Sequence, residues 1–427
     1  MEYDAVIVGA GIIGLATAYH IKKQRPDDQI LLIDKFSAAG QGNTAKSAAM
    51  FRCFFSSNTN LTLVNSTVEF FKHVQSLPTV DLKLMYVGYL WLLSKKQYGT
   101  ITPVLASMAQ KNLEYSVFEG SELAERLNLR IAVTGDEEAR LMGLKDVDKG
   151  VLVPKAGSID IDRLVQFYET EIRRMHVEIR YNTEAGTVLA GPKDSLGIPG
   201  EPLFWQESVV TGVDTSSGKI KAKKTIIAAG VWANSLLAKV GIYFPMEPLK
   251  RQLFSVKAST PELQQLLHTK GFNKRDSLPF TILPSPKVYV KPALEEEAFW
   301  FSYGDHFPRA YQLDEDPQPE ENFYRYGIYQ VASKYLPQFV GAHPSSSWAG
   351  QYALNTIDGQ PVIFEQNNLI VVGSCSGSGN MKCDAIGRIA AALYAGEEFA
   401  QLYGNERFRV SDLGLKNRNV ESEKLII

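Results

Sequence analysis

The sequence predicts an α/β domain built on a parallel sheet, interrupted by an α+β domain with an antiparallel sheet. Three observations support this fold class. Residues 4–33 follow the pattern strand, glycine turn, helix, strand, and residues 225–232 and 369–373 are further apolar segments that run into glycine. Residues 245–307 instead alternate short strand patterns with proline turns, which is typical of an antiparallel sheet. Pieces of the parallel sheet lie at both ends of the chain, so the second domain is inserted rather than appended.

The first elements form a βαβ unit. Residues 4–8 (DAVIV) are rich in β-branched side chains, and residues 11–24 continue as a helix. A turn at residues 25–28 (RPDD) precedes a second apolar strand at residues 29–33. Strands joined through a helix in this way are parallel, and such sheets are covered on both faces.

Patterns farther along the chain predict the remaining elements. Residues 37–49 are small and polar, and residues 190–207 are rich in glycine and proline, so both are expected as loops. Ser158 opens an N-capped helix that runs to about residue 174. Further helices are expected at 61–77, 101–111, 121–127 and 384–395, and strands at 177–181, 219–222, 225–232, 252–257, 288–291, 298–303 and 369–373.

Composition excludes several classes of function. The chain has 427 residues, and 45 Lys and Arg against 47 Asp and Glu give a net charge of −2, with no basic field for nucleic acid. Cys53, Cys375 and Cys383 are too scattered for a disulfide framework or a zinc site. Residues 5–19 are uncharged but lack the features of a signal peptide or a spanning helix. We expect a cytoplasmic protein without a transmembrane segment, and leave peripheral membrane contact open.

The sharpest motif is GAGIIG at residues 9–14, between the first strand and the first helix. There Gly9 permits a tight turn, Gly11 lets the backbone approach a pyrophosphate, and Gly14 lets helix and strand pack closely. Asp34 ends the second strand, 20 residues after Gly14, where a carboxylate accepts hydrogen bonds from ribose hydroxyls. The pattern predicts a Rossmann-like dinucleotide site, against the alternative of a glycine turn without a ligand. It does not separate NAD from FAD.

Motifs along the whole chain resemble those of the FAD-dependent D-amino acid oxidase and sarcosine oxidase superfamily. The segments AAMFR at 48–52, YALNTID at 352–358 and MKCDAIG at 381–387 are most similar to archaeal dye-linked L-proline dehydrogenases. A more distant resemblance is to the sarcosine oxidase β subunit and to a mitochondrial flavoprotein that assists respiratory-chain assembly. The superfamily resemblance rests on residues 9–14 with Asp34, GNTAKS at 42–47, GSID at 157–160, IIAAGVWA at 226–233, WAG at 348–350, DGQP at 358–361 and GSCSGSG at 373–379.

This resemblance implies an FAD-binding domain of the glutathione-reductase type. We assign residues 1–80, 150–240 and 345–427 to it, and 81–149 and 241–344 to an inserted substrate-binding domain. FAD is expected to be non-covalent, because no cysteine lies where tethering relatives carry one, and Cys375 is expected to serve packing. The residues expected to bind FAD are Gly9, Gly11, Ile12, Gly14, Asp34, Lys35, Gly42, Thr44, Ala45, Ser47, Ala185, Ala229, Gly230, Trp232, Gly350, Gly377, Ser378, Gly379 and Met381.

The resemblance also implies a substrate amine that carries a carboxylate, and a carboxylate in a water-poor pocket needs a cation. Arg52, which follows the flavin-binding loop, is the first candidate, with a surface arginine as the alternative. Arg251 matches an Arg-Gln motif of the relatives, but a structural ion pair is an equal reading there. Tyr289 and Lys291 alternate on one strand and therefore share a side, which faces either the substrate or the solvent.

One departure from the relatives favours a dehydrogenase. In sarcosine oxidase relatives a lysine near the flavin activates oxygen, and an ungapped register from Tyr289 places Trp300 at that position, although Lys291 is a possible substitute. An indole cannot supply the positive charge that superoxide formation requires. His176, His306, Lys382 and Arg388 are expected to be structural or solvent-facing.

The sequence therefore leads to a functional hypothesis. It is an FAD-dependent dehydrogenase that oxidises a secondary amino acid, with L-proline as first choice, to its imine by hydride transfer to flavin N5. Electrons would pass to a quinone or dye-like acceptor. The alternatives are an oxidase for glycine, sarcosine or a D-amino acid, and a flavoprotein subunit or assembly factor that acts through a partner. A homo-oligomer is possible, and the apolar residues 425–427 are expected to dock on the body or on a neighbouring subunit.

Overall fold

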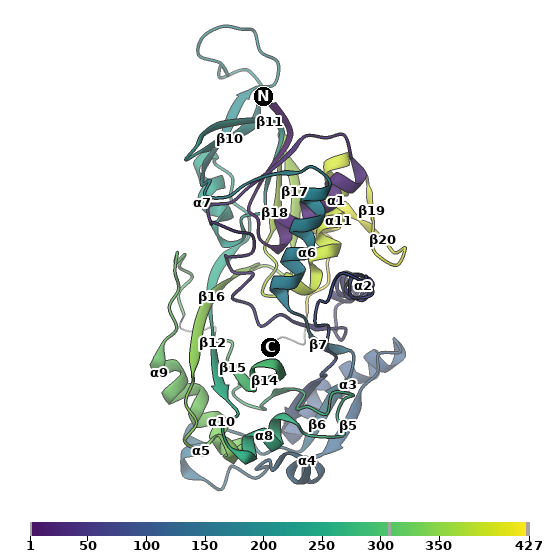
Figure 1. Ribbon diagram of the computed structural model, residues 1–427, viewed down its shortest axis with the longest axis vertical. Coiled ribbons are helices and arrows are strands. Elements are labelled where there is room, and N and C mark those ends of the chain that lie inside the picture. Colours follow the sequence, from purple (N-terminus) through teal and green to yellow (C-terminus); the bar gives the residue numbers. More distant parts are fainter. Residues whose placement is uncertain (1, 306–308, 424–427) are drawn as a thin grey trace.

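The computed structural model describes residues 2–305 and 309–423 (Figure 1). Most of the described strands belong to two eight-stranded sheets, one in the upper and one in the lower part of the view. The predicted fold class, a parallel α/β sheet with a second, largely antiparallel sheet, is confirmed. Two small sheets pair β3 (Met50–Arg52) with β7 (Ala156–Ser158), and β19 (Phe399–Gln401) with β20 (Arg407–Arg409).

The first sheet has a parallel core. β1 pairs in parallel with β2 and β11, and β11 pairs in parallel with β18. All residues of β2 and β18 are buried, which is why their sequences are continuous apolar runs rather than alternating patterns. The strand order is β17 (Val362–Gln366), β18 (Leu369–Gly373), β11 (Gly218–Ile227), β1 (Glu2–Val8), β2 (Ile30–Ile33) and β8 (Glu178–Arg180), with β10 (Ser208–Thr215) and β9 (Ala185–Pro192) joined antiparallel at β11.

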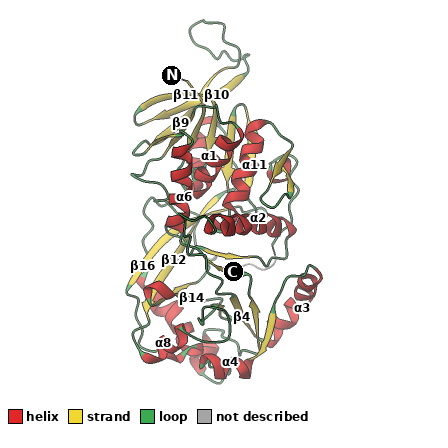
Figure 2. Ribbon diagram, turned by 45° about the vertical axis from the view of Figure 1, so that its right-hand side comes forward, coloured by secondary structure: helices red, strands yellow, loops and turns green. Residues whose placement is uncertain are grey.

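Two helices from opposite ends of the chain pack together over this sheet. They are α1 (Ile12–Gln24) and α11 (Cys383–Ala395), and α6 (Ile161–Arg174) lies beside α1 (Figure 2). A Cβ on Gly387 would lie 2.7 Å from the backbone of Ala16, so glycine at this position permits the close approach. As a result, the loop before α11 lies next to the glycine turn before α1.

The second sheet is antiparallel except where β13 runs parallel to β4. β12 is its longest strand and pairs over nine residues with β16, which leads back toward the first sheet. The order is β16 (Ser346–Leu354), β12 (Glu247–Lys257), β15 (Ala298–Ser302), β14 (Tyr289–Ala293), β13 (Phe280–Ile282), β4 (Tyr89–Leu93), β6 (Lys149–Val153) and β5 (Ser116–Glu119).

Several element boundaries differ from the sequence expectations. β11 is one strand across residues that we expected to form two. α3 starts at Lys95 rather than 101, because Ser94 and Gln97 form a capping box there. The N-capped helix start expected within residues 158–164 is present, and Asp160 is the cap of α6. β6 and β16 lie in the second sheet, although most of their residues fall in segments that we assigned to the FAD-binding domain.

The remaining helices surround the two sheets. Among residues 2–305 and 309–423, no helix has both the length and the apolar composition that a membrane-crossing segment needs. The same residues contain no group of three His, Cys, Asp or Glu side chains placed to hold a metal ion. His306 and residues 425–427, for which we stated expectations, lie outside the described residues. The helices that surround the two sheets are α2 (Asn58–Gln75), α3 (Lys95–Gln110), α4 (Gly120–Leu127), α5 (Glu137–Leu141), α7 (Ala233–Leu237), α8 (Pro261–Leu267), α9 (Glu321–Phe323) and α10 (Tyr329–Tyr335).

Candidate active site

Two adjoining cavities lie where the carboxyl ends of the parallel strands meet the second sheet. The first, of about 420 Å³, is lined by the glycine turn and is called the dinucleotide cavity below. The second, of about 460 Å³, lies under the second sheet and is called the inner cavity. The two share a wall made of Ser47, Ala48, Arg251, Tyr289, Ser302, Tyr352, Ser376, Gly377 and Asn380.

The glycine turn has the shape that its motif predicts. Gly9 has a φ of +109°, and a Cβ there would lie 2.6 Å from the carbonyl oxygen of Ala228. A Cβ on Gly14 would lie 1.8 Å from the carbonyl oxygen of Gly9, so any side chain would separate the turn from α1. The N–H of Ile12 donates to Thr44 Oγ1 at 3.1 Å, which fixes the following loop against the start of the helix. The turn therefore leaves room for a phosphate group at the N-terminus of α1.

Asp34 ends β2 at the rim of the dinucleotide cavity. Its two carboxylate oxygens accept hydrogen bonds from the N–H of Ala10 (2.6 Å) and the N–H of Phe36 (2.8 Å). Burial raises the pKa of Asp34, while these two backbone bonds oppose that rise. The bonds hold the carboxylate in one orientation, and its remaining lone pairs can accept from ribose hydroxyls.

Most of the residues expected to bind the cofactor line this cavity. Gly14 and Ala45 do not: Gly14 packs the turn, and Ala45 is exposed and donates its N–H to the carbonyl of Gly40 at 3.0 Å. Ser378 and Met381 line the inner cavity instead. The expected residues that line the dinucleotide cavity are Gly9, Gly11, Ile12, Asp34, Lys35, Gly42, Thr44, Ser47, Ala185, Ala229, Gly230, Trp232, Gly350, Gly377 and Gly379.

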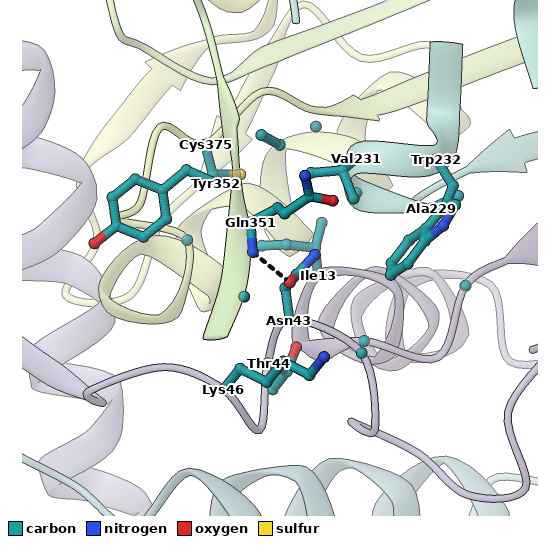
Figure 3. A pocket seen from close by; sticks show the side chains of 18 of the residues that line it. Ile13, Asn43, Thr44, Lys46, Ala229, Val231, Trp232, Gln351, Tyr352 and Cys375 are labelled. Carbon is teal, nitrogen blue, oxygen red and sulfur yellow. Dashed lines mark hydrogen bonds between the residues drawn. The ribbon is translucent and has the colours of Figure 1, made fainter. Parts of the chain in front are cut away.

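The loop before α11 meets the loop after β2 at the shared wall. Asn380 Nδ2 donates to Ser47 Oγ at 2.7 Å. Gly377 has a φ of +78°, and a Cβ there would lie 2.3 Å from the ring of Tyr352. Figure 3 shows Tyr352 and Cys375 on one side of the cavity, and the bond that the N–H of Gln351 donates to Asn43 Oδ1 (2.7 Å). These contacts join three segments of the chain, at residues 43–47, 351–352 and 375–380.

A further segment contacts the dinucleotide cavity through Glu315 and was missed by sequence reasoning. We call residues 309–320 the strap. Glu315 lines the cavity, forms an ion pair with Lys35 and accepts a hydrogen bond from Trp232 Nε1 at 2.9 Å. The Lys35 ammonium lies 4.2 Å from the centre of the Trp232 ring. No motif signals the strap, because its residues are irregular and mostly exposed.

Arg52 lines the inner cavity and is 6% exposed. It ends β3, and its guanidinium lies 4.5 Å from the ring centre of Phe55 and 5.6 Å from that of Trp91. Burial lowers the pKa of Arg52, whereas Tyr89 and Glu423 act in the opposite direction. An arginine retains its proton under such conditions, so a buried cation faces the cavity.

The burial of Lys382 contradicts a sequence expectation. We expected a solvated helix residue, but Lys382 is 1% exposed and lines the inner cavity. Its ammonium lies 3.5 Å from Gln360 Oε1, and burial lowers the pKa of Lys382 to about 8. The error arose because most of α11 is buried from its first residue, Cys383, so the lysine directly before it does not reach solvent. Arg388, expected to be solvated too, forms an ion pair with the buried Asp384 at 2.7 Å.

The three other substrate candidates have different surroundings. Tyr289 lines both cavities. Arg251 lines both as well, but it donates to the carbonyl of Asp305 at 2.8 Å and lies 3.5 Å from the Asp305 carboxylate. This agrees with the structural ion pair that the sequence offered as one interpretation of Arg251. Lys291 lines neither cavity: its ammonium donates to the carbonyl of Ala48 at 2.8 Å. Burial lowers the pKa of Lys291 to about 7.

Trp300 lies directly opposite Lys291 in the β14–β15 pair. The Lys291 ammonium is 3.7 Å from the centre of the indole ring, and neither side chain is part of a cavity wall. Together they support the loop at Ala48, which does line both cavities. His176 is exposed after α6.

The end of the described chain also reaches the inner cavity. Ser422 and Glu423 line it, and Glu423 accepts hydrogen bonds from Ser56 and Ser57 before α2. Farther back, Arg418 forms a two-pronged ion pair with Asp358 at 2.6 and 2.7 Å. The sequence motifs give no sign of this contact, since it joins segments that are far apart in the chain.

Comparisons with known proteins agree with this architecture. Human peroxisomal sarcosine oxidase is 24% identical over 58% of this chain, and the match spans only 55% of the human protein. The bovine FAD-dependent oxidoreductase domain-containing protein 1 is 22% identical over 91% of this chain and 80% of its own. The crystal structure of L-proline dehydrogenase from P. horikoshii has a TM-score of 0.71 and 20% identity, with 93% of this chain and 94% of that chain covered. NikD, an amino acid oxidase, has a TM-score of 0.72, 17% identity and coverage of 100% and 99%. At these identities the structures show a shared fold.

The residues present fit the cofactor that this fold accommodates. The glycine turn leaves space where a Cβ would clash, Asp34 faces the ribose position, and the cavity continues to the wall at Gly377. A family model described as FAD dependent oxidoreductase matches residues 4–393. The sequence expectation of this superfamily is confirmed, and the chain belongs to the FAD-dependent oxidoreductase family.

Proposed function

We propose that this protein is a dehydrogenase that oxidises a secondary amino acid, with L-proline the first substrate to test, to the corresponding imine. FAD would be held non-covalently in the dinucleotide cavity. Electrons would leave to a quinone or dye-like acceptor. The solved L-proline dehydrogenase of similar fold supports the choice of substrate, and the sarcosine oxidase relative supports an amine that carries a carboxylate.

One observation carries this proposal. The inner cavity shares a wall with the dinucleotide cavity and is lined by two buried cations, Arg52 and Lys382. Cations that line a water-poor cavity attract a carboxylate. A substrate carboxylate would bind beside both, while its amine end would lie toward the shared wall. The cavity of about 460 Å³ is large enough for a small amino acid.

The residues that line the two cavities would have separate roles in the reaction. FAD, when bound, supplies the acceptor for a hydride from the carbon next to the substrate nitrogen. Arg52 and Lys382 hold and orient the carboxylate, and Tyr289 closes the wall between the two cavities. Loss of a hydride from a neutral secondary amine would leave a protonated imine, which gives its N–H proton to solvent water afterwards. No general base among the described cavity residues is therefore required if the amine binds in its neutral form.

Two features support non-covalent FAD and a dehydrogenase. Cys375 is the cysteine that lines the dinucleotide cavity, and burial raises the pKa of its thiol to about 11, which makes it a poor nucleophile. Lys291 is held by Ala48 and Trp300, away from both cavities. A lysine that lines neither cavity is badly placed to activate oxygen beside a bound flavin.

An anaerobic spectroscopic assay tests the proposal. Purified protein is mixed with L-proline, D-proline, sarcosine or glycine without oxygen, and loss of the visible flavin absorbance is followed. We expect L-proline to bleach the flavin fastest, and a quinone to restore the colour faster than air does. Bleaching by none of these amines would contradict the proposal.

Two rival functions give different results in the same assay. An oxidase, as the sarcosine and glycine oxidase relatives suggest, would reoxidise rapidly in air and release hydrogen peroxide. A flavoprotein that acts through a partner would keep its flavin oxidised with every amine. The cytoplasmic location and any homo-oligomer remain expectations from the sequence.

A further inference from the structure

The loop between β9 and β10 projects from the first sheet and carries an unusual set of exposed side chains. It comprises residues 193–207 and forms the protrusion at the top of Figures 1 and 2. Phe204 is 101% exposed, Trp205 60%, Leu196 57% and Ile198 47%. Single exposed apolar residues are common on protein surfaces, but four within residues 196–205 of one projecting loop indicate a binding surface. We call these four residues the apolar tip.

Polar groups at the neck of the loop are satisfied within the loop itself. Glu201 accepts hydrogen bonds from Ser195 Oγ (2.7 Å) and the N–H of Leu196 (2.6 Å). Gln206 donates to Glu201 (3.0 Å) and accepts from the N–H of Leu203 (2.7 Å). These bonds give the loop a defined shape in which the four apolar side chains stay exposed.

The size of the apolar tip argues against a protein partner. Two aromatic side chains offer about 300–500 Å² at most, and Leu196 and Ile198 are only half-exposed. A stable protein interface buries about 800 Å² on each partner. Charged residues flank the tip, among them the Lys193–Glu207 ion pair at 2.9 Å, so the apolar area does not extend down the loop.

Trp and Phe at a projecting tip are instead suited to the interface of a lipid bilayer. We propose that the apolar tip inserts into the surface of a bilayer and docks the protein there as a peripheral membrane protein. One Lys against Asp194, Glu201 and Glu207 gives residues 193–207 a net charge of −2 (1 − 3 = −2). Zwitterionic lipid is therefore the preferred surface, since an anionic one would repel the loop.

Vesicle flotation tests this proposal with the full-length holoprotein. We expect it to float with phosphatidylcholine vesicles, to bind less to vesicles with added phosphatidylglycerol, and to resist release by high salt. Trp205 is one of five tryptophans, so its emission is taken as the difference between the wild type and W205F; this difference should shift to the blue and be quenched by brominated lipid. The variant L196S/F204S keeps Trp205 and should bind at least about tenfold more weakly, since each buried apolar side chain contributes a factor of that order.

The matched control is L141S/Y326S, which removes one leucine and one aromatic ring that are exposed elsewhere. It should bind vesicles like the wild type. Equal loss of binding in both double variants would overturn the proposal, as would a wild type that stays unbound at every lipid composition. Binding only to anionic vesicles would also overturn it. If sedimentation shows a dimer that L196S/F204S dissociates, the apolar tip is a protein interface instead. None of these readouts depends on the reaction catalysed.

Discussion

Arg52 and Lys382 face one cavity from two segments of the chain, on β3 and before α11, and each is almost fully buried. The phenyl ring of Phe55 and the indole of Trp91 flank the Arg52 guanidinium, and Gln360 stands beside the Lys382 ammonium. Rigid surroundings of this kind hold the cations in place before a ligand arrives, which favours binding of a small anion.

The variant R52A should lower kcat/KM for L-proline by about 100-fold or more, because two charge-assisted hydrogen bonds contribute at least about 3 kcal/mol together. The kcat/KM of R52K should lie between those of the wild type and R52A, since a lysine ammonium lacks the planar fork of a guanidinium. Steady-state kinetics with prolinol, which has no carboxylate, provides the control. An equal loss for both substrates would show that Arg52 does not bind the carboxylate.

Lys382 should make anion binding depend on pH. Because burial lowers its pKa to about 8, the ammonium is present below that pH and is lost above it. Binding of 2-tetrahydrofuroate, an anion without an ionisable amine, should therefore weaken by up to about tenfold per pH unit above pH 8. Flavin difference spectra measure this dissociation constant. K382M should bind more weakly and show no such dependence, and an unchanged profile in K382M would assign the titration to another group.

At the scale of elements, two irregular segments complete the cavities that the sheets and helices outline. The strap contacts the dinucleotide cavity through Glu315, and residues 414–423 contact the inner cavity through Ser422 and Glu423. Such connecting segments open more readily than sheets and helices, because fewer buried contacts hold them. Their anchoring residues should therefore affect exchange of ligands more than folding.

E315A should release FAD about two- to tenfold faster than the wild type. It removes a partly exposed ion pair and one hydrogen bond, each worth up to about 1 kcal/mol. The measurement is the rise of free FAD fluorescence after dilution. D316A is the matched control, because Asp316 is mostly exposed and lies 3.9 Å from Lys46. Equal release from both variants would rule out a specific contribution of Glu315.

R418A should raise KM several-fold and widen the range of amino acids accepted, with little effect on FAD content. Arg418 binds Asp358 and also donates to the carbonyls of Pro361 and Leu413. Without it, residues 414–423 lose one of the contacts that hold them to the body of the protein, while those of Glu421 and Glu423 remain. R409A, which breaks an exposed ion pair with Glu398, is the control. Unchanged KM values in R418A would show that the remaining contacts are enough to hold residues 414–423 in place.

At the scale of the whole molecule, the dinucleotide cavity is a junction of distant segments. Residues near positions 9–14, 34–48, 183–186, 228–239, 350–353 and 372–380 all contribute to it. A ligand in this cavity binds only the folded state of the chain, because unfolding separates these segments. Binding and global stability are thereby coupled.

FAD should therefore raise the unfolding temperature of the apoprotein by about 5 °C or more. Free FAD at 100 times its dissociation constant adds about 2.7 kcal/mol, and about 1 kcal/mol shifts the midpoint by about 2–4 °C in a large domain. Tryptophan fluorescence during heating measures the shift. NAD should leave the midpoint unchanged, and a larger effect of NAD would assign a different dinucleotide to the cavity.

Much of the fold could be predicted because its signals are local. The parallel strands β1, β2 and β18 appear as apolar runs, the first followed by glycine and the last ending on it. Gly9 and Gly14 occur where only glycine avoids a clash with the neighbouring backbone. Helix starts were less accurate, as α3 shows, because the Ser94–Gln97 cap precedes the apolar pattern that we used.

The sequence by itself thus determined the fold class, the family, and many of the residues that line the dinucleotide cavity. Each of these follows from short motifs whose geometry is fixed by neighbours in the chain. Only the tertiary structure decided that Lys382 is buried beside Arg52, that Lys291 is withdrawn against Trp300, and that Glu315 and Glu423 reach the two cavities. Burial and charge depend on contacts between segments hundreds of residues apart, and no local pattern encodes those contacts.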